Sequence, residues 1–226
     1  MRLENLNWMD VEVYLKQDDR LMIVLGSTEQ HGFLSLTTDV KIPMALGDAA
    51  SQKTGVLLAP PLNFGCAPYF LDFPGTISLR VTTLLAVVED VIRSFYRQGF
   101  RRILVLNGHG GNYPAQARLQ ELANELPELR LSWYAWWQSH SVEELAARHE
   151  IKPYHASWLE AFSFCLVSDL PVGEKTPVAN KGILNAEETK EVFGDGVFGG
   201  KYEVDREIMS ELFEVCLKDI LYLLDF

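Results

Sequence analysis

RRILVLNGHGGN, residues 101–112, joins a short apolar run to a glycine-rich turn. An apolar run of this length, bounded by turn residues, predicts a buried strand. PAQARLQELANEL (114–126) follows at once and predicts a helix, because a proline is tolerated in the first helical turn. A strand, a turn and a helix in succession are typical of an α/β domain.

The same unit recurs along the chain. Further strands are predicted at LMIVLGS (21–27), GVLLAPPL (55–62) and RLSWYAWWQ (130–138). Apolar residues three and four apart predict helices over 82–100, with Gly99 as the stop, and over 141–150 and 203–224. Residues 173–205, rich in Gly, Pro and charge, are expected to form a long excursion near a site or a subunit contact. These patterns predict a layered α/β domain with a mostly parallel sheet.

Composition limits the functional classes. A chain of 226 residues suits one domain over 1–226. Its formal net charge of −11 repels phosphate backbones, which argues against nucleic acid as a partner. The longest uncharged stretch, 54–71, holds three prolines and is a poor membrane span, and the charged start predicts no secretory signal. Three scattered cysteines, Cys66, Cys165 and Cys216, are expected to be core thiols in a reducing cytoplasm.

Potential metal ligands gather after two of the predicted strands. Glu29, His31 and Asp39 follow the first strand, and His109 lies in the turn at 107–112. Since the carboxyl ends of parallel strands meet at one sheet edge, these loops are expected to lie together. His155 and Glu160 stand five apart at what looks like the start of a helix, whereas His140 and His149, in or beside a charged helix, are expected at the surface.

The donor types indicate a metal, although each residue taken singly is ambiguous. Carboxylates and imidazoles without thiolates suit Zn²⁺, Mn²⁺ or Fe²⁺. A lone Glu beside a loop is more often a solvated charge, and a lone His after a strand is more often hydrogen-bonded within the structure. NGHGGN could also cradle a phosphate, but it lacks the Lys-Ser/Thr of a P-loop. The four tryptophans Trp133, Trp136, Trp137 and Trp158 could wall a pocket or belong to the core.

Several motifs together resemble one family. GSTEQHG (26–32) with TD (38–39), FPGTISL (73–79), GFRRILVLNGHGGN (99–112) and HASWLE (155–160) resemble the creatininase, or creatinine amidohydrolase, family in its GHGGN branch. The resemblance runs in order from Leu21 to Glu160. It implies a three-layer α/β/α sandwich with a mostly parallel central sheet, two divalent metal ions (Zn, Mn or Fe) and a homo-oligomer, often a hexamer.

The resemblance also implies roles for individual residues. Glu29 and His109 would bind one metal, His31 the other, and Asp39 would bridge the two. Creatininase proper carries a ligand Glu two residues after the His of its Gly-His motif, where this chain has Gly111. The GHGGN branch looks instead to Glu160, which is therefore both a metal ligand and a catalytic candidate. His155 matches the histidine credited with proton transfer.

Three departures from the family pattern leave two function hypotheses. The loop before Asp39 is one residue shorter than in the family pattern, and Phe33 and Leu34 lie near the place of its second His. Phe70 stands where the family commonly has His. Ala161 and Phe162 replace the Thr-Ser that follows the glutamate in the family. The leading hypothesis is a creatininase-like amidohydrolase that cleaves a C–N bond of a small cyclic amide, a formamide or a peptide-like amide with a two-metal-activated water. The alternative is a metal-binding member that has lost catalysis and serves as a binding or assembly subunit.

Overall fold

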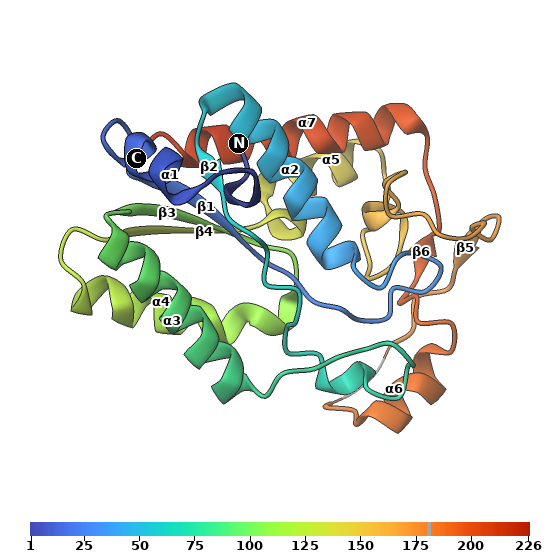
Figure 1. Cartoon of the computed structure of the whole chain (residues 1–226). Coiled ribbons are helices and arrows are strands. Elements are labelled where there is room, and N and C mark those ends of the chain that lie inside the picture. Colours follow the sequence, from blue (N-terminus) through green and yellow to red (C-terminus); the bar gives the residue numbers. More distant parts are fainter. Residues whose placement is uncertain (180–181) are drawn as a thin grey trace.

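Four parallel strands form the centre of the protein, seen in a computed structural model that describes residues 1–179 and 182–226 (Figure 1). Their order is β2-β1-β3-β4, and their bounds are β1 Arg20–Leu25, β2 Leu57–Leu58, β3 Arg102–Asn107 and β4 Arg130–Ala135. β1 and β3 pair in register from Arg20 opposite Arg102 to Leu25 opposite Asn107. Both strands therefore end level with one another, and the predicted parallel sheet is confirmed.

Helices cover both faces of this sheet. They are α1 Trp8–Leu15, α2 Thr38–Thr54, α3 Val81–Gln98, α4 Tyr113–Glu125, α5 His140–Arg148, α6 Ala186–Phe193 and α7 Arg206–Leu223. Because successive strand side chains point to opposite faces, Met22 and Val24 pack in one buried cluster with residues of α2, α5 and α7. Leu21 and Ile23 pack in a second cluster with residues of α3 and α4, to which α1 adds partly buried side chains. The expected three-layer α/β/α sandwich is confirmed, with α2 and α7 on one side of the sheet and α3 and α4 on the other (Figure 1).

The predicted helices are present with small shifts at their ends. The helix expected over 82–100 is α3, which buries Leu84, Val88 and Ile92 at four-residue steps. It ends at Gly99, whose φ of 115° is open to glycine but strained for other residues. The helices expected over 114–126, 141–150 and 203–224 are α4, α5 and α7.

Two predicted strands are shorter than expected, and the helices α1, α2 and α6 were not predicted. The strand expected over 55–62 pairs only at Leu57–Leu58, because the two prolines that follow carry no N–H for the ladder. The strand expected over 130–138 ends at Ala135 and continues as a 3₁₀ turn, Trp136–Gln138. α2 contains Pro43 and a glycine, which are both signals against a helix, so its existence did not follow from the sequence pattern.

The excursion expected over 173–205 carries secondary structure of its own. It holds α6 and a two-stranded antiparallel sheet of β5 Glu174–Lys175 and β6 Gly200–Lys201, while residues 180–181 lie outside the described part. α6 begins with a capping box between Asn185 and Glu188 and lies beside the 3₁₀ turn Pro68–Phe70. The sequence analysis expected this segment near a site or a subunit contact, and its Phe198 lines the cavity described below.

The three cysteines are buried and free, as predicted for core thiols. In the described part of the chain, every helix is too short or too polar to cross a lipid bilayer.

Candidate metal centre

The ends of β1 and β3 position three of the predicted ligands. Glu29 and His31 lie in the segment after β1, and His109 lies in the turn after β3. Thr28 bridges to Ile77, and the Glu29 N–H donates to the Leu36 carbonyl at 2.9 Å, which fixes the segment after β1. The two loops lie together because their strands are neighbours that end in register.

α2 supplies Asp39 from its first turn, a placement that the sequence pattern did not predict. Pro43, four residues later, has no N–H to donate to the Asp39 carbonyl. The backbone of Gly108 packs directly against this carbonyl, and a Cβ at position 108 would overlap its oxygen. The glycine thus allows the turn after β3 to bring His109 against Asp39.

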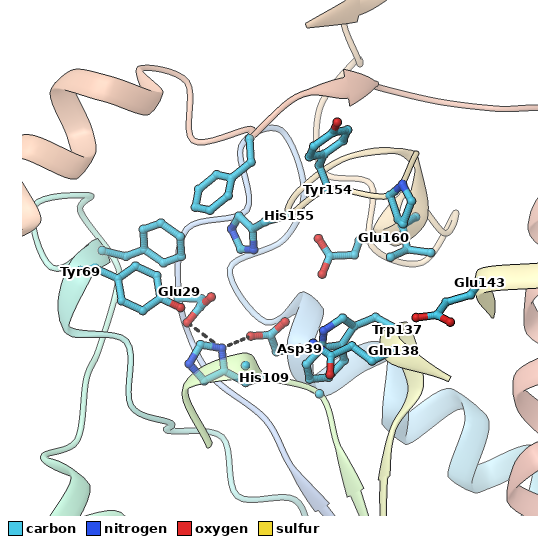
Figure 2. Close-up of a pocket in the computed structure, with 16 residues that line it drawn as sticks. Glu29, Asp39, Tyr69, His109, Trp137, Gln138, Glu143, Tyr154, His155 and Glu160 are labelled. Carbon is cyan, nitrogen blue, oxygen red and sulfur yellow. Dashed lines mark ion pairs between the residues drawn. The ribbon is translucent and has the colours of Figure 1, made fainter. Parts of the chain in front are cut away.

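The predicted ligands form two groups that share Asp39, and Figure 2 draws the first of them with its ion pairs. In the first group, Nδ1 of His109 lies 3.1 Å from Oε2 of Glu29 and 3.0 Å from Oδ2 of Asp39. In the second, Nε2 of His31 lies 3.0 Å from Oδ1 of Asp39 and 3.8 Å from Oε1 of Glu160. Within each group the potential ligand atoms lie within 4.8 Å of one another. All five residues are buried.

Two buried atoms in this cluster have no hydrogen-bond partner within the described residues. They are Nε2 of His31 and Oδ2 of Asp39, although each has an oppositely charged group about 3 Å away. Buried polar atoms are nearly always hydrogen-bonded, since leaving one unpaired is costly. Atoms that approach closely without aligned hydrogen bonds are suitably arranged to share a cation, so the residues fit a pair of divalent ions.

Outer contacts hold the ligand side chains in this orientation. Nε2–H of His109 donates to the Cys66 carbonyl at 3.0 Å, which leaves Nδ1 facing the cluster. Nδ1–H of His31 donates to the Glu29 carbonyl at 3.1 Å, which leaves Nε2 facing Asp39. The Ser27 hydroxyl donates to Oε2 of Glu29 at 2.9 Å. Such contacts fix the tautomer and direction of ligands in metal sites.

The buried charges shift one another's pKa values. Burial would lower the pKa of His31, but the carboxylates of Asp39 and Glu160 raise it to about 10. Burial raises the pKa of Glu160 to about 7, although the positive charge of His31 acts to lower it. Burial would raise the pKa of Asp39, yet His31 and His109 lower it overall. Strong coupling between buried groups is common at functional sites.

His155 lies next to the cluster rather than at a helix start. It stands in a turn before the 3₁₀ turn Trp158–Glu160, which corrects the expected helix. Ala156 takes a left-handed φ of 57°, and its N–H donates to Oε2 of Glu160 at 2.6 Å. This tight turn lets His155 and Glu160 both face the cluster. The pKa of His155 is lowered well below its ordinary value, mainly by burial.

The cluster lies in the wall of a cavity of about 420 Å³ (Figure 2). Aromatic side chains form much of the remaining wall: Tyr69, Phe70, Trp137, Tyr154 and Phe198. Of the four tryptophans considered from the sequence, Trp137 alone lines this cavity, while Trp136 and Trp158 are buried in the core. The two histidines expected at the surface, His140 and His149, are exposed. Tyr69, Tyr154 and Phe198 could not be identified as wall residues from a single sequence, because only the fold brings them to the cavity.

A comparison with protein families decides the relationship. The family model described as "Creatininase: Creatinine amidohydrolase" matches residues 4–224. The chain belongs to the creatininase family.

Curated members of the creatininase family are similar over parts of the chain. The 3-dehydro-scyllo-inosose hydrolase of Thermotoga maritima is 27% identical over 165 residues, which are 70% of this chain and 51% of that protein. The creatinine amidohydrolase of Pseudomonas putida is 35% identical over 114 residues, 47% of this chain and 44% of that protein. The mycofactocin precursor peptide peptidase of Mycobacterium ulcerans is 39% identical over 105 residues, 42% of each. The chain spans about half or less of the length of these relatives.

Solved creatininase structures share the fold. A mutant creatininase described as Zn-Zn type superposes with a TM-score of 0.81 at 22% identity and covers 98% of this chain and 95% of that one. A structure titled "Creatininase Mn" has a TM-score of 0.79 at 22% identity, with 98% and 96% covered.

This creatininase-family chain has Gly111 two residues after His109, where the pattern of creatininase proper has a ligand glutamate. A Cβ at Gly111 would overlap the Cys66 carbonyl oxygen and lie 2.5 Å from Nε2 of His109. A ligand side chain therefore cannot be accommodated at 111 in this backbone. The Glu160 carboxylate, which reaches the cluster from the other side, offers an oxygen to the second group instead.

Proposed function

We propose that this protein is a metal-dependent amidohydrolase that cleaves a C–N bond of a small cyclic amide, a formamide or a peptide-like amide. The observation that carries the proposal is the pair of buried ligand groups that share Asp39 and open into one cavity. Family membership supports it, because named relatives include a creatinine amidohydrolase, a second hydrolase and a peptidase.

In this proposal Glu29 and His109 hold one divalent ion, His31 and Glu160 hold the other, and Asp39 binds both. The distances of 3.0–3.1 Å between His109, Glu29 and Asp39 and of 3.0 Å between His31 and Asp39 support these assignments. When bound, a pair of such ions lowers the pKa of water and polarises a carbonyl group. Oxygen and nitrogen donors suit Zn²⁺, Mn²⁺ or Fe²⁺.

We assign proton transfer to His155. Its Nε2 lies 3.0 Å from the side-chain amide nitrogen of Gln30 and 3.2 Å from the Gln30 backbone carbonyl oxygen, and these two contacts hold the ring in place. The imidazole of His155 would take a proton from the attacking water and return it to the leaving nitrogen, which could not depart as an amide anion. Phe70 and Phe198 pack against the ring, each with its centroid 4.9 Å from that of His155.

The alternative is a binding or assembly subunit without catalysis. Apolar side chains where the family has polar ones favour it: Phe70 beside His155, and Phe162 packed on Trp136 in the core. Against it, the five proposed ligands form two groups that share Asp39, and four of the five, Glu29, Asp39, His109 and Glu160, line the cavity. The balance of these observations favours the enzyme.

Metal analysis and turnover test the two functions together. Purified protein should contain up to two divalent ions per chain, and Glu29→Ala and Asp39→Ala should contain fewer; undiminished metal in both variants would refute the site. Creatinine, formamidopyrimidines and short peptides form the first substrate panel. If metal-loaded protein turns over none of them and His155→Ala leaves stability and ligand binding unchanged, the binding-subunit function is supported.

We further propose that residues 1–226 act as one creatininase-like unit and that the chain works in the cytoplasm. We also propose that it forms a homo-oligomer, with six copies by analogy with the family. The free, buried thiols support a reducing compartment. Sedimentation of the purified protein tests the assembly.

A further inference from the structure

We infer that the cavity selects amides whose end remote from the cleaved bond carries a positive charge, and that Glu143 recognises this charge. The inference rests on the proposed amidohydrolase function, because it names the substrate class of the same site. Glu143 lines the cavity but takes no part in either ligand group.

Glu143 lies at the far end of the cavity from the ligand cluster. It stands in the first turn of α5, directly after the 3₁₀ turn Trp136–Gln138 that carries the Trp137 wall. Figure 2 shows its carboxylate directed toward Trp137 and Gln138, with Glu29 and His155 at the opposite side of the view. A ligand that reaches the cluster with one end can therefore reach Glu143 with the other.

The carboxylate of Glu143 has no hydrogen bond or ion pair with any residue in the described part of the chain. Charged groups close to it in sequence have partners. Glu144 lies 3.1 Å from His140, and Arg148 lies 2.8 Å from Glu211. An unpaired carboxylate at the wall of a cavity is available to a ligand.

The charge of the cavity favours a cation at this end. Its described lining includes four carboxylates and two histidines, but neither lysine nor arginine. Two divalent ions would more than neutralise Glu29, Asp39 and Glu160, whereas Glu143 lies outside both ligand groups and has no lysine or arginine beside it in the described lining. A substrate with a remote carboxylate would meet this charge without any cation to balance it.

The walls add a preference for a flat cation. Trp137 and Tyr154 line the cavity with Glu143. Aromatic faces attract planar cations, and a carboxylate accepts two parallel N–H bonds from a guanidinium or amidinium group. The remote group is therefore expected to be a guanidinium, an amidinium or a compact ammonium.

Glu143 could instead serve only the helix, since an acidic residue in a first turn interacts favourably with the helix dipole. That role changes stability but does not distinguish a charged ligand from a neutral one. The test therefore compares two ligands of almost the same shape, benzamidinium and benzamide, by calorimetric titration of zinc-loaded protein. The variants are Glu143→Gln and, as a matched control on the next residue, Glu144→Gln.

We expect benzamidinium to bind wild-type protein about five-fold more tightly than benzamide, because Glu143 is exposed and solvent screens its charge. Glu143→Gln should reduce this ratio to about two-fold or less by weakening benzamidinium alone, and Glu144→Gln should keep it. If zinc-loaded wild-type protein binds benzamidinium and benzamide with equal affinity, the inference is wrong. It is also wrong if Glu143→Gln weakens the binding of both ligands equally. Neither result would bear on the proposed amidohydrolase function. Protein that takes up no zinc would overturn the proposed function as well.

Discussion

Phe70 stacks on His155, with ring centroids 4.9 Å apart and planes inclined by 28°. Phe70 is 1% exposed, and α6 packs against the 3₁₀ turn that carries it. The family often has a histidine at this position, so the chain exchanges a polar neighbour of His155 for an apolar one. The ring of His155 is thus oriented by packing against Phe70 and by contacts with Gln30, and the His31 ring lies on it with its centroid 4.5 Å away.

Phe70→Leu tests this packing. The substitution keeps an apolar side chain but removes the stacked ring, so we expect a loss of about 1 kcal/mol in the free energy of unfolding. Metal content should be unchanged, because Phe70 offers no ligand atom, while turnover falls as His155 gains freedom. Denaturant unfolding measures the change in stability, and steady-state kinetics measures the change in turnover. Phe64→Leu, at a 46% exposed position on the same segment, is the control, and equal turnover in the two variants would contradict the positioning role.

Asp39→Asn should remove more metal than any other single isosteric change. Asp39 lies within ligand distance of both groups, whereas His109 and Glu160 each belong to one. We expect His109→Ala and Glu160→Gln to retain about one ion per chain and Asp39→Asn to retain none. Elemental analysis after dialysis gives these ratios, and circular dichroism checks the fold. A full equivalent of metal in Asp39→Asn would show that the carboxylate is not shared.

Two adjacent glycines should respond differently to a methyl group. A Cβ at Gly111 would overlap the Cys66 carbonyl oxygen, while a Cβ at Gly110 would meet nothing within 4 Å. We expect Gly111→Ala to cost about 1–3 kcal/mol and to lower metal content, because the strain falls on the turn that carries His109. Gly110→Ala should stay within about 0.5 kcal/mol of wild type. Thermal unfolding compares them, and similar midpoints would contradict the close approach at Gly111.

An ion-pair network between α3 and α4 should make stability depend on acid pH. Hydrogen bonds from Arg118 and Arg93 lower the pKa of Glu89 from its ordinary 4.5 to about 2. A carboxylate whose pKa is lower in the folded state stabilises the fold fully above its unfolded pKa, and the effect is lost as the pH falls toward the folded pKa. Glu89→Gln should therefore differ from wild type most above pH 4.5, and the difference should shrink toward pH 2.

Unfolding midpoints from about pH 2 to pH 7 measure this dependence. Glu12→Gln, whose carboxylate stands 4.0 Å from Lys16 on exposed α1, is the control. A constant difference between Glu89→Gln and wild type over the whole range would exclude the lowered pKa as its cause.

The sequence was sufficient for the sheet and for the residues that gather at its edge. β1 and β3 are nearly uninterrupted apolar runs, and α3 has a strict four-residue spacing of buried side chains, so local pattern and global fold agree there. Glu29, His31, Asp39, His109 and Glu160 were all predicted from the sequence, and the structure brings them together. Their roles as ligands stay a proposal.

The missed features depend on tertiary contacts. α2 forms despite Pro43 because one side of it is buried against the sheet and α7, which outweighs weak propensity. The turn at His155 needs a left-handed Ala156, for which the sequence contains no sign. Trp137 was one of four tryptophans considered for a pocket wall, and only the fold shows that it is the one that lines the cavity. Glu143 was missed, because nothing in its spacing relates it to the ligand residues.

The inner cluster and the outer wall come from different parts of the chain. Glu29, Asp39 and His109 stand at the ends of β1 and β3 and at the start of α2, whereas Trp137, Gln138 and Glu143 belong to one short stretch after β4. The proposed metal centre and the proposed recognition site for the remote end of the substrate thus lie on separate segments of the chain. Replacing residues 136–143 with the equivalent stretch of another family member is a direct way to retarget the protein while leaving its chemistry intact.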